Sequence, residues 1–209
     1  MTRRFFVAEV TFGDYSKRME TQTIFFIGKP GCGKGDQAKL LADKTGWKFL
    51  SAGDELRRMR AIDTPVWRKV KSEMDAGLLL PHWFASYIFL TEFFSLPDNT
   101  NVIFDGFDRS IPEAEVIMES LAWLGRPFSV VYLKVSDEEI KKRIALRKGV
   151  QGRADDSVVD ERLKEYRALT EPVVEMFRKK GLLIEINGEG TREKIAADIN
   201  KALNIPSTG

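Results

Sequence analysis

The sequence predicts an α/β fold in which a five-stranded parallel sheet is flanked by helices. From Thr23 onward, short apolar runs alternate with longer stretches of helical periodicity, which is typical of successive βαβ units. The apolar runs are almost continuously hydrophobic, as expected of strands that are covered on both faces. Together these two observations favour a doubly covered parallel sheet over a sandwich or a helical bundle.

The expected strands and helices follow one another along the chain. Strands are predicted at Thr23–Ile27, Lys48–Leu50, Asn101–Phe104, Ser129–Val135 and Leu182–Ile186. Helices are predicted at Lys34–Lys44, Asp54–Arg60, Pro65–Ala76, Trp83–Phe94, Pro112–Leu124, Asp137–Arg147, Val158–Lys180 and Arg192–Leu203. Pro65 and Pro112 stand where first-turn prolines are tolerated, and Ser136 can cap the helix that follows it.

Two segments carry further structural expectations. The stretch from Arg147 to Ser157 is polar, contains glycine and carries both signs of charge, so a projecting loop is predicted there. The helix at Trp83–Phe94 is rich in aromatic residues, which at helical spacing are more often core than a base-stacking platform. We interpret these residues as core: Trp83, Phe84, Tyr87, Phe89, Phe93 and Phe94. His82 precedes this helix and is interpreted as a terminus residue.

The amino-acid composition excludes several classes of protein. The chain of 209 residues suits one domain, and 33 Lys+Arg against 31 Asp+Glu exclude a strongly basic nucleic-acid-binding domain. A single Cys and a single His exclude a disulfide framework within the chain and a multi-cysteine zinc site, and they fit a reducing cytoplasm. No apolar run approaches the roughly 20 residues of a membrane span. Residues 1–22 are interpreted as an N-terminal extension, a short strand or tail rather than a targeting segment.

A glycine-rich segment from Gly28 to Lys34 follows the first predicted strand and opens the first helix. Its glycines allow backbone N–H groups to wrap a phosphate, the helix N-terminus adds partial positive charge, and Lys34 adds a full one. A turn that merely joined strand to helix would not require lysine at this spacing. Gly35 stands where the general pattern has the Ser or Thr that binds Mg²⁺.

Several segments in order resemble the adenylate kinase family of nucleoside monophosphate kinases, which includes UMP-CMP kinases. The phosphate loop G-K-P-G-C-G-K-G-D-Q is similar to the family's G-x-P-G-x-G-K-G-T-Q. Further matches are L-S-A-G-D-E-L-R at Leu50–Arg57, M-D-A-G-L-L-L-P at Met74–Pro81 and D-G-F-D-R at Asp105–Arg109. G-R-A-D-D at 152–156 resembles the arginine-bearing short lid. The resemblance covers residues 23–209 and implies a P-loop NTPase fold with an acceptor-binding segment at about 51–80 and a lid at about 147–157.

The resemblance implies a role for each matching residue. The implied ATP-binding residues are Gly28, Pro30, Gly31, Cys32, Gly33, Lys34, Gly35, Asp36 and Arg143. The implied acceptor-binding residues are Ala52, Gly53, Arg57, Gly77, Leu80, Gly106, Arg109 and Glu113. The implied catalytic residues are Lys34, Arg109, Arg143, Arg147, Arg153 and Arg162. Asp105 is implied to orient the waters of a Mg²⁺ cofactor, because a hard cation that keeps its waters needs few carboxylates. Taken singly, Arg143 or Arg162 would be a solvated surface charge.

Three residues depart from the family pattern. Asp36 replaces a Thr, and its carboxylate should repel ATP phosphates unless it points away from them or is screened. Asp108 replaces a Pro, which should loosen the turn that presents Arg109. Glu113 replaces the Gln with which the family reads adenine, and an ionised carboxylate only accepts hydrogen bonds. Glu113 therefore weakens the prediction of strict AMP specificity.

The expected function is that of a cytoplasmic, monomeric kinase that phosphorylates a nucleoside monophosphate with ATP. AMP is the expected acceptor, with UMP or CMP as the alternative. A second alternative is a catalytically weak nucleotide-binding protein of the same fold, in which Asp36 and Asp108 impair transfer. No nucleic-acid or membrane partner is expected.

Overall fold

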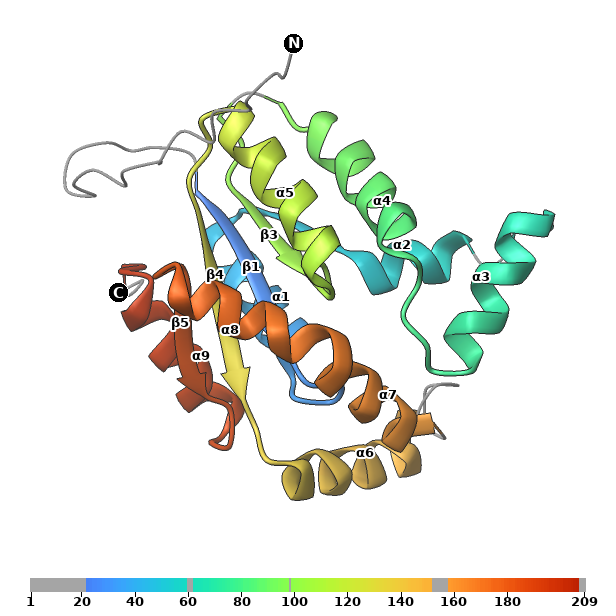
Figure 1. The fold of residues 1–209 in the computed structure, drawn as a ribbon. Coiled ribbons are helices and arrows are strands. Elements are labelled where there is room, and N and C mark those ends of the chain that lie inside the picture. Colours follow the sequence, from blue (N-terminus) through green and yellow to red (C-terminus); the bar gives the residue numbers. More distant parts are fainter. Residues whose placement is uncertain (1–21, 60–61, 98, 152–157, 207–209) are drawn as a thin grey trace, which may run out of the picture.

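A five-stranded parallel sheet forms the centre of the protein (Figure 1). The computed structural model describes residues 22–59, 62–97, 99–151 and 158–206. The strands are β1 (Thr23–Gly28), β2 (Lys48–Ser51), β3 (Val102–Asp105), β4 (Phe128–Lys134) and β5 (Leu183–Asn187), in the order β2-β3-β1-β4-β5. Each predicted strand is confirmed to within one residue at either end. β1 is central, so its carboxyl end delivers the phosphate loop to the middle of the sheet edge.

Helices connect the strands and cover both faces of the sheet (Figure 1). They are α1 (Lys34–Thr45), α2 (Ala52–Met59), α3 (Pro65–Asp75), α4 (His82–Phe94), α5 (Ile111–Trp123), α6 (Asp137–Gln151), α7 (Val159–Glu165), α8 (Glu171–Lys179) and α9 (Arg192–Ala202). Pro65 and Pro112 lie in the first turns of their helices, as predicted. Ser136 Oγ accepts a hydrogen bond from the Glu139 N–H at 3.4 Å, which supports the predicted cap.

The two faces of β1 belong to two hydrophobic clusters. Phe25 and Ile27 pack in one cluster with residues of α4, α5 and α8. Ile24 and Phe26 pack in the other with residues of α1, α6 and α9. All four side chains are almost fully buried. Because successive strand residues point to opposite faces, a continuous apolar run is what a doubly covered strand requires.

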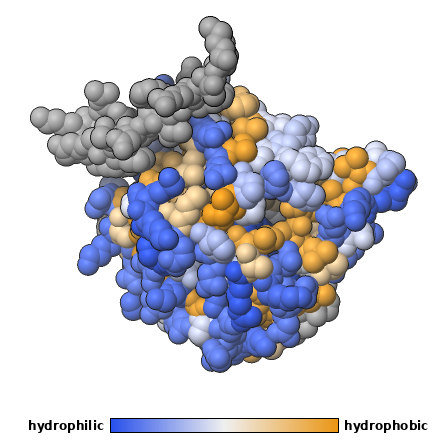
Figure 2. Space-filling model, viewed as in Figure 1, coloured by the Kyte–Doolittle hydropathy of each residue, from blue (hydrophilic) through white to orange (hydrophobic). Residues whose placement is uncertain are grey.

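The expectation that the aromatic residues of α4 are core is half wrong. Phe84, Phe89 and Phe93 are buried against the sheet, α5 and Phe107. Trp83, Tyr87 and Phe94 are 63%, 62% and 56% exposed. One face of α4 packs inward, and a period of 3.6 residues turns the other face outward. The face seen in Figure 2 carries hydrophobic residues in separate groups among hydrophilic ones.

The helices before and after the predicted lid differ from their predictions in two ways. α6 continues to Gln151, so residues 147–151 are helical and the predicted loop begins later. A single glycine, Gly149, costs a helix only about 1 kcal/mol, and Arg147, Lys148 and Gln151 around it are good helix formers. The helix predicted at Val158–Lys180 is continuous but contains a π-helical segment, Tyr166–Thr170, between α7 and α8. No helix within the described residues is long and apolar enough to cross a membrane.

Candidate active site

A cavity of about 510 Å³ opens at the carboxyl ends of β1 and β3. In an open parallel sheet, ligands bind at this edge, where the loops that follow the strands converge. The cavity walls come from the phosphate loop, α2, the segment before α4, the loop before α5 and α7. Its charged lining residues include Lys34, Arg57, Glu73, Arg109, Arg162 and Glu165. Four cations from distant parts of the chain therefore surround one space.

The phosphate loop has the backbone that its glycines predict. Gly31 and Gly33 have φ of +81° and +91°, in the left-handed region that side chains avoid. A Cβ at Gly31 would also lie 3.0 Å from Ile144 of α6. Lys34 is the first residue of α1, and desolvation lowers the pKa of its amine, with Arg109 and Arg162 acting in the same direction. Gly28, Pro30 and Lys34 line the cavity.

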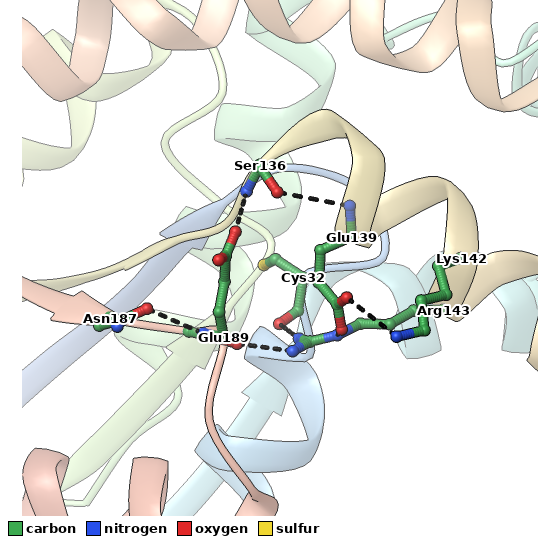
Figure 3. Close-up of polar contacts among 8 residues, drawn as sticks. Cys32, Ser136, Glu139, Lys142, Arg143, Asn187 and Glu189 are labelled. Atoms are coloured by element: carbon green, nitrogen blue, oxygen red, sulfur yellow. Dashed lines mark hydrogen bonds and ion pairs between the residues drawn. The ribbon is translucent and has the colours of Figure 1, made fainter.

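Arg143 fastens α6 to the phosphate loop (Figure 3). Its Nη1 donates to the Cys32 carbonyl oxygen at 3.1 Å, and its Nη2 donates to the Gly188 carbonyl oxygen at 2.8 Å. Its Nε donates to Glu139 at 2.8 Å, one turn earlier on α6. Cys32 itself is buried, and desolvation raises the pKa of its thiol, which favours the tolerated loop residue over a reactive one.

Asp105 ends β3 directly beside the start of α1. A Cβ built on Gly35 would lie 2.9 Å from Asp105 Oδ2, so only glycine fits there without displacement. Asp105 Oδ2 also accepts from Ser51 Oγ at 3.5 Å, at the limit of a hydrogen bond. Asp105 Oδ1 is buried and has no hydrogen-bond partner among the described residues. An unpartnered carboxylate oxygen next to the phosphate loop fits a bound cation or its waters.

Another part of the cavity wall is built on α2, the segment after α3 and the loop after β3. Ala52, Gly53, Arg57, Gly77 and Leu80, to which the resemblance assigns acceptor binding, line this part. A Cβ at Gly53 would lie 3.1 Å from Arg57 Nη1, and one at Gly77 would lie 2.8 Å from Val158. Gly77 also has φ of +77°. Close approach of side chains therefore accounts for glycine at both positions.

The turn that presents Arg109 is tightly held, so the expected loosening by Asp108 is not found. Asp108 has φ of +60°, a left-handed conformation that proline cannot adopt. Glu113 accepts from the backbone N–H of Asp108 at 3.0 Å and of Arg109 at 3.1 Å. Arg109 Nε donates to the Gly106 carbonyl oxygen at 2.7 Å. These bonds replace the restraint that a proline ring would give.

Other predicted residues have less direct or undescribed positions. Asp36 is exposed in the first turn of α1 and is not among the residues that line the cavity. Arg162 lines the cavity and lies 3.1 Å from a Cβ built on Gly77. Arg147 belongs to α6 by its backbone, and its side chain lies outside the described atoms. Arg153, with most of the predicted lid, lies outside the described residues.

The structure adds residues that the sequence reasoning missed. Thr170 Oγ1 donates to the Arg109 carbonyl oxygen at 2.8 Å, and Glu165 accepts from the Leu79 N–H at 3.3 Å. Lys29 Nζ lies 2.6 Å from Asp137 Oδ1, and Arg167 pairs with the other oxygen of that carboxylate. These contacts join segments far apart in sequence. No local spacing signals them.

The fold and the site together define a protein of the P-loop NTPase class, with a glycine-rich loop and four cationic side chains at one cavity. The adenylate kinase family model matches residues 26–182. The adenylate kinase of Thermus thermophilus is 38% identical, over 88% of this chain and 98% of that protein. The adenylate kinase of Maricaulis maris is 39% identical, over 86% of this chain and 97% of that protein. The adenylate kinase of Bacteroides fragilis is 38% identical, over 87% of this chain and 97% of that protein. The chain belongs to the adenylate kinase family.

Proposed function

We propose that this protein transfers the terminal phosphoryl group of ATP to AMP, giving two molecules of ADP. One observation carries the proposal: Lys34, Arg57, Arg109 and Arg162 converge on a single cavity beside a phosphate loop. Two nucleotides bring many negative charges together, and such a cluster of cations is otherwise unfavourable. The relatives, which are named adenylate kinases, support AMP as the acceptor over UMP or CMP.

The phosphate loop and Arg143 belong to the ATP side of the proposed reaction. Backbone N–H groups of residues 28–36, except Pro30, which has none, would cradle the phosphates, with Lys34 on the outer ones. Arg143 fixes the loop through the Cys32 carbonyl oxygen, which keeps those N–H groups in position. Mg²⁺ would be held near Asp105 through water and would neutralise charge on the phosphates. Among the described residues, no group of three or more His, Cys, Asp or Glu side chains is arranged so that it could hold a metal ion directly.

The segment at about 51–80 and the loop before α5 form the acceptor side. Arg57 and Arg109 would bind the AMP phosphate, since a planar guanidinium can bind two phosphate oxygens at once. An oxygen of that phosphate forms a bond to the γ-phosphorus of ATP, while the bond to the β–γ bridging oxygen breaks. Arg162, together with Arg147 and Arg153 of the proposed lid at about 147–157, would stabilise the group in transfer. The protein's work is positioning and charge neutralisation.

The test is a coupled assay of ADP formation with ATP and a panel of AMP, CMP, UMP and GMP. AMP should give the highest kcat/KM, and Arg109→Ala should raise the KM for AMP far more than the KM for ATP. Absence of turnover with every acceptor, combined with normal ATP binding, would instead establish a catalytically weak nucleotide-binding protein. A monomer in the cytoplasm is part of the proposal, and sedimentation of the purified chain tests its oligomeric state.

A further inference from the structure

Two carboxyl groups lie buried where the loop after β3 turns into α5. Asp108 is fully buried and Glu113 is 3% exposed. Neither oxygen of the Asp108 side chain has a hydrogen-bond partner among the described residues. Each oxygen of Glu113 accepts one backbone N–H, that of Asp108 or that of Arg109. The Glu113 carboxyl group therefore bridges two consecutive peptide groups of the turn.

This bridge requires a carboxyl group in particular. A glutamine at 113 would offer one acceptor oxygen, and its NH₂ group would face the second N–H group. A buried N–H without an acceptor costs about as much as a lost hydrogen bond. The backbone N–H at 108 in turn exists because that residue is Asp and not Pro. The residues at 108 and 113 are thus matched to one another.

The bridged turn carries Arg109, whose side chain enters the cavity. Its Nε donates to the Gly106 carbonyl oxygen, and a Cβ built on Gly106 would lie 2.8 Å from Arg109 Nη2. Thr170 Oγ1, from the π-helical segment, donates a hydrogen bond to the Arg109 carbonyl oxygen. The backbone of Arg109 is thus held at its N–H by Glu113 and at its C=O by Thr170. Little freedom remains in the direction that the guanidinium takes.

We propose that Glu113 is a positioning residue for Arg109: its carboxyl group holds the left-handed turn at Asp108 and thereby aims the guanidinium at the acceptor phosphate. This inference rests on the proposed function for the identity of the acceptor. It assigns Glu113 a role toward the phosphate of the acceptor, through Arg109. A role in reading the base is the competing assignment, and the two make different predictions for a ligand that lacks phosphate.

The first experiment measures binding of AMP and of adenosine by calorimetry to the wild type, Glu113→Gln and Glu115→Gln. Glu115 is the matched control, an exposed carboxylate two residues further along α5. Glu113→Gln should weaken AMP binding about tenfold, the equivalent of one charge-assisted hydrogen bond, and leave adenosine binding within about twofold. In an Arg109→Ala background the same substitution should have no further effect on AMP. Equal losses for AMP and adenosine, or no loss of AMP binding, would overturn the proposal.

The second experiment uses the wild-type chain and does not depend on how the variant folds. Burial raises the pKa of Glu113 to about 7, against the opposing effects of Arg109 and the two N–H bonds. Asp108 and Arg109 face Glu113 from the loop before α5. The charged or titratable groups that other elements contribute to the same cavity are Lys34, Arg57, Glu73, His82, Arg162, Glu165 and Tyr166. The ¹⁵N-amide resonances of Asp108 and Arg109 should shift together through one ionisation near pH 7.

The absence of a common titration of the two amides would overturn the inference. A wild-type chain that binds neither AMP nor adenosine would refute the proposed function instead. The amide titration would still decide whether Glu113 holds the turn.

Discussion

Lys29 Nζ lies 2.6 Å from Asp137 Oδ1, an ion pair that joins the phosphate loop to the first residue of α6. The side chains are only 18% and 26% exposed, and Arg167 of the π-helical segment pairs with the other oxygen of Asp137. The hydrogen bond from Lys29 is the main cause that lowers the pKa of Asp137. Asp137 therefore joins α6 and the π-helical segment to the loop that would bind ATP.

We expect this pair to be coupled more strongly than an exposed one. A double-mutant cycle of Lys29→Met and Asp137→Asn should give a coupling energy of about 1 kcal/mol in urea unfolding at pH 7. The matched control is Lys134 with Glu185, where Lys134 is 67% exposed and a coupling below about 0.5 kcal/mol is expected. Equal coupling in both pairs would contradict the structural role assigned to Asp137.

Arg143→Ala should impair the ATP side selectively. The substitution removes the donors to Cys32 and Gly188, so the loop N–H groups lose part of their fixed arrangement. We expect the KM for ATP to rise about tenfold or more with a smaller change in the KM for AMP, measured by the coupled assay. Lys142→Ala is the control, because Lys142 is 71% exposed and its Nζ lies as far as 3.9 Å from Glu139 Oε2, so little interaction is lost. A rise in both KM values alike would point to a general loss of structure.

Gly35→Ala should lower turnover by about tenfold or more. The new Cβ would lie 2.9 Å from Asp105 Oδ2, so either the carboxylate or the start of α1 must shift. Because Asp105 is the proposed Mg²⁺-orienting residue, the Mg²⁺ concentration that gives half-maximal activity should rise as well. Lys39→Ala, an exposed position on the same helix, serves as the control. Unchanged kcat and Mg²⁺ dependence in Gly35→Ala would remove Asp105 from that role.

The buried carboxyl groups predict an unusual pH dependence of stability. Desolvation raises the pKa of Glu113 from 4.5 to about 7, and desolvation together with Glu113 raises that of Asp108 well above 3.8. Each group binds its proton more tightly in the folded state, so its contribution is complete below its unfolded pKa, 4.5 for Glu113 and 3.8 for Asp108, and is lost as pH rises. For Glu113 the loss spans about pH 4.5 to 7 and amounts to roughly 3 kcal/mol.

Urea unfolding at pH 5.5 and pH 8 measures this effect. The wild type should lose more stability across the interval than the double variant Asp108→Asn/Glu113→Gln, which has no carboxyl group at either position. The comparison of the two slopes cancels titration elsewhere in the chain. Parallel slopes would show that neither carboxyl group is protonated in the folded state at pH 5.5.

Much of the fold followed from patterns that are local. The apolar run at Thr23–Gly28 and the glycines after it predict strand, loop and helix, because backbone preferences and covered faces act over a few residues. The resemblance also assigned phosphate-binding roles to Arg57, Arg109 and Arg162, and these three side chains line the cavity. Which face of α4 stays exposed was beyond such reasoning, since aromatic residues lie on both its buried and its exposed face.

The sequence by itself determined the family pattern, the parallel sheet and the cations of the site, because each depends on residue type and spacing. Tertiary structure alone decided what those residues touch. In the sequence, Asp108 is a replacement for the family's proline, yet in the structure its N–H donates to Glu113. Glu113 stands at the position with which the family contacts the base, yet both its oxygens accept backbone N–H groups. Hydrogen bonds and burial depend on where separate segments meet in space, and a pattern along the chain does not contain that information.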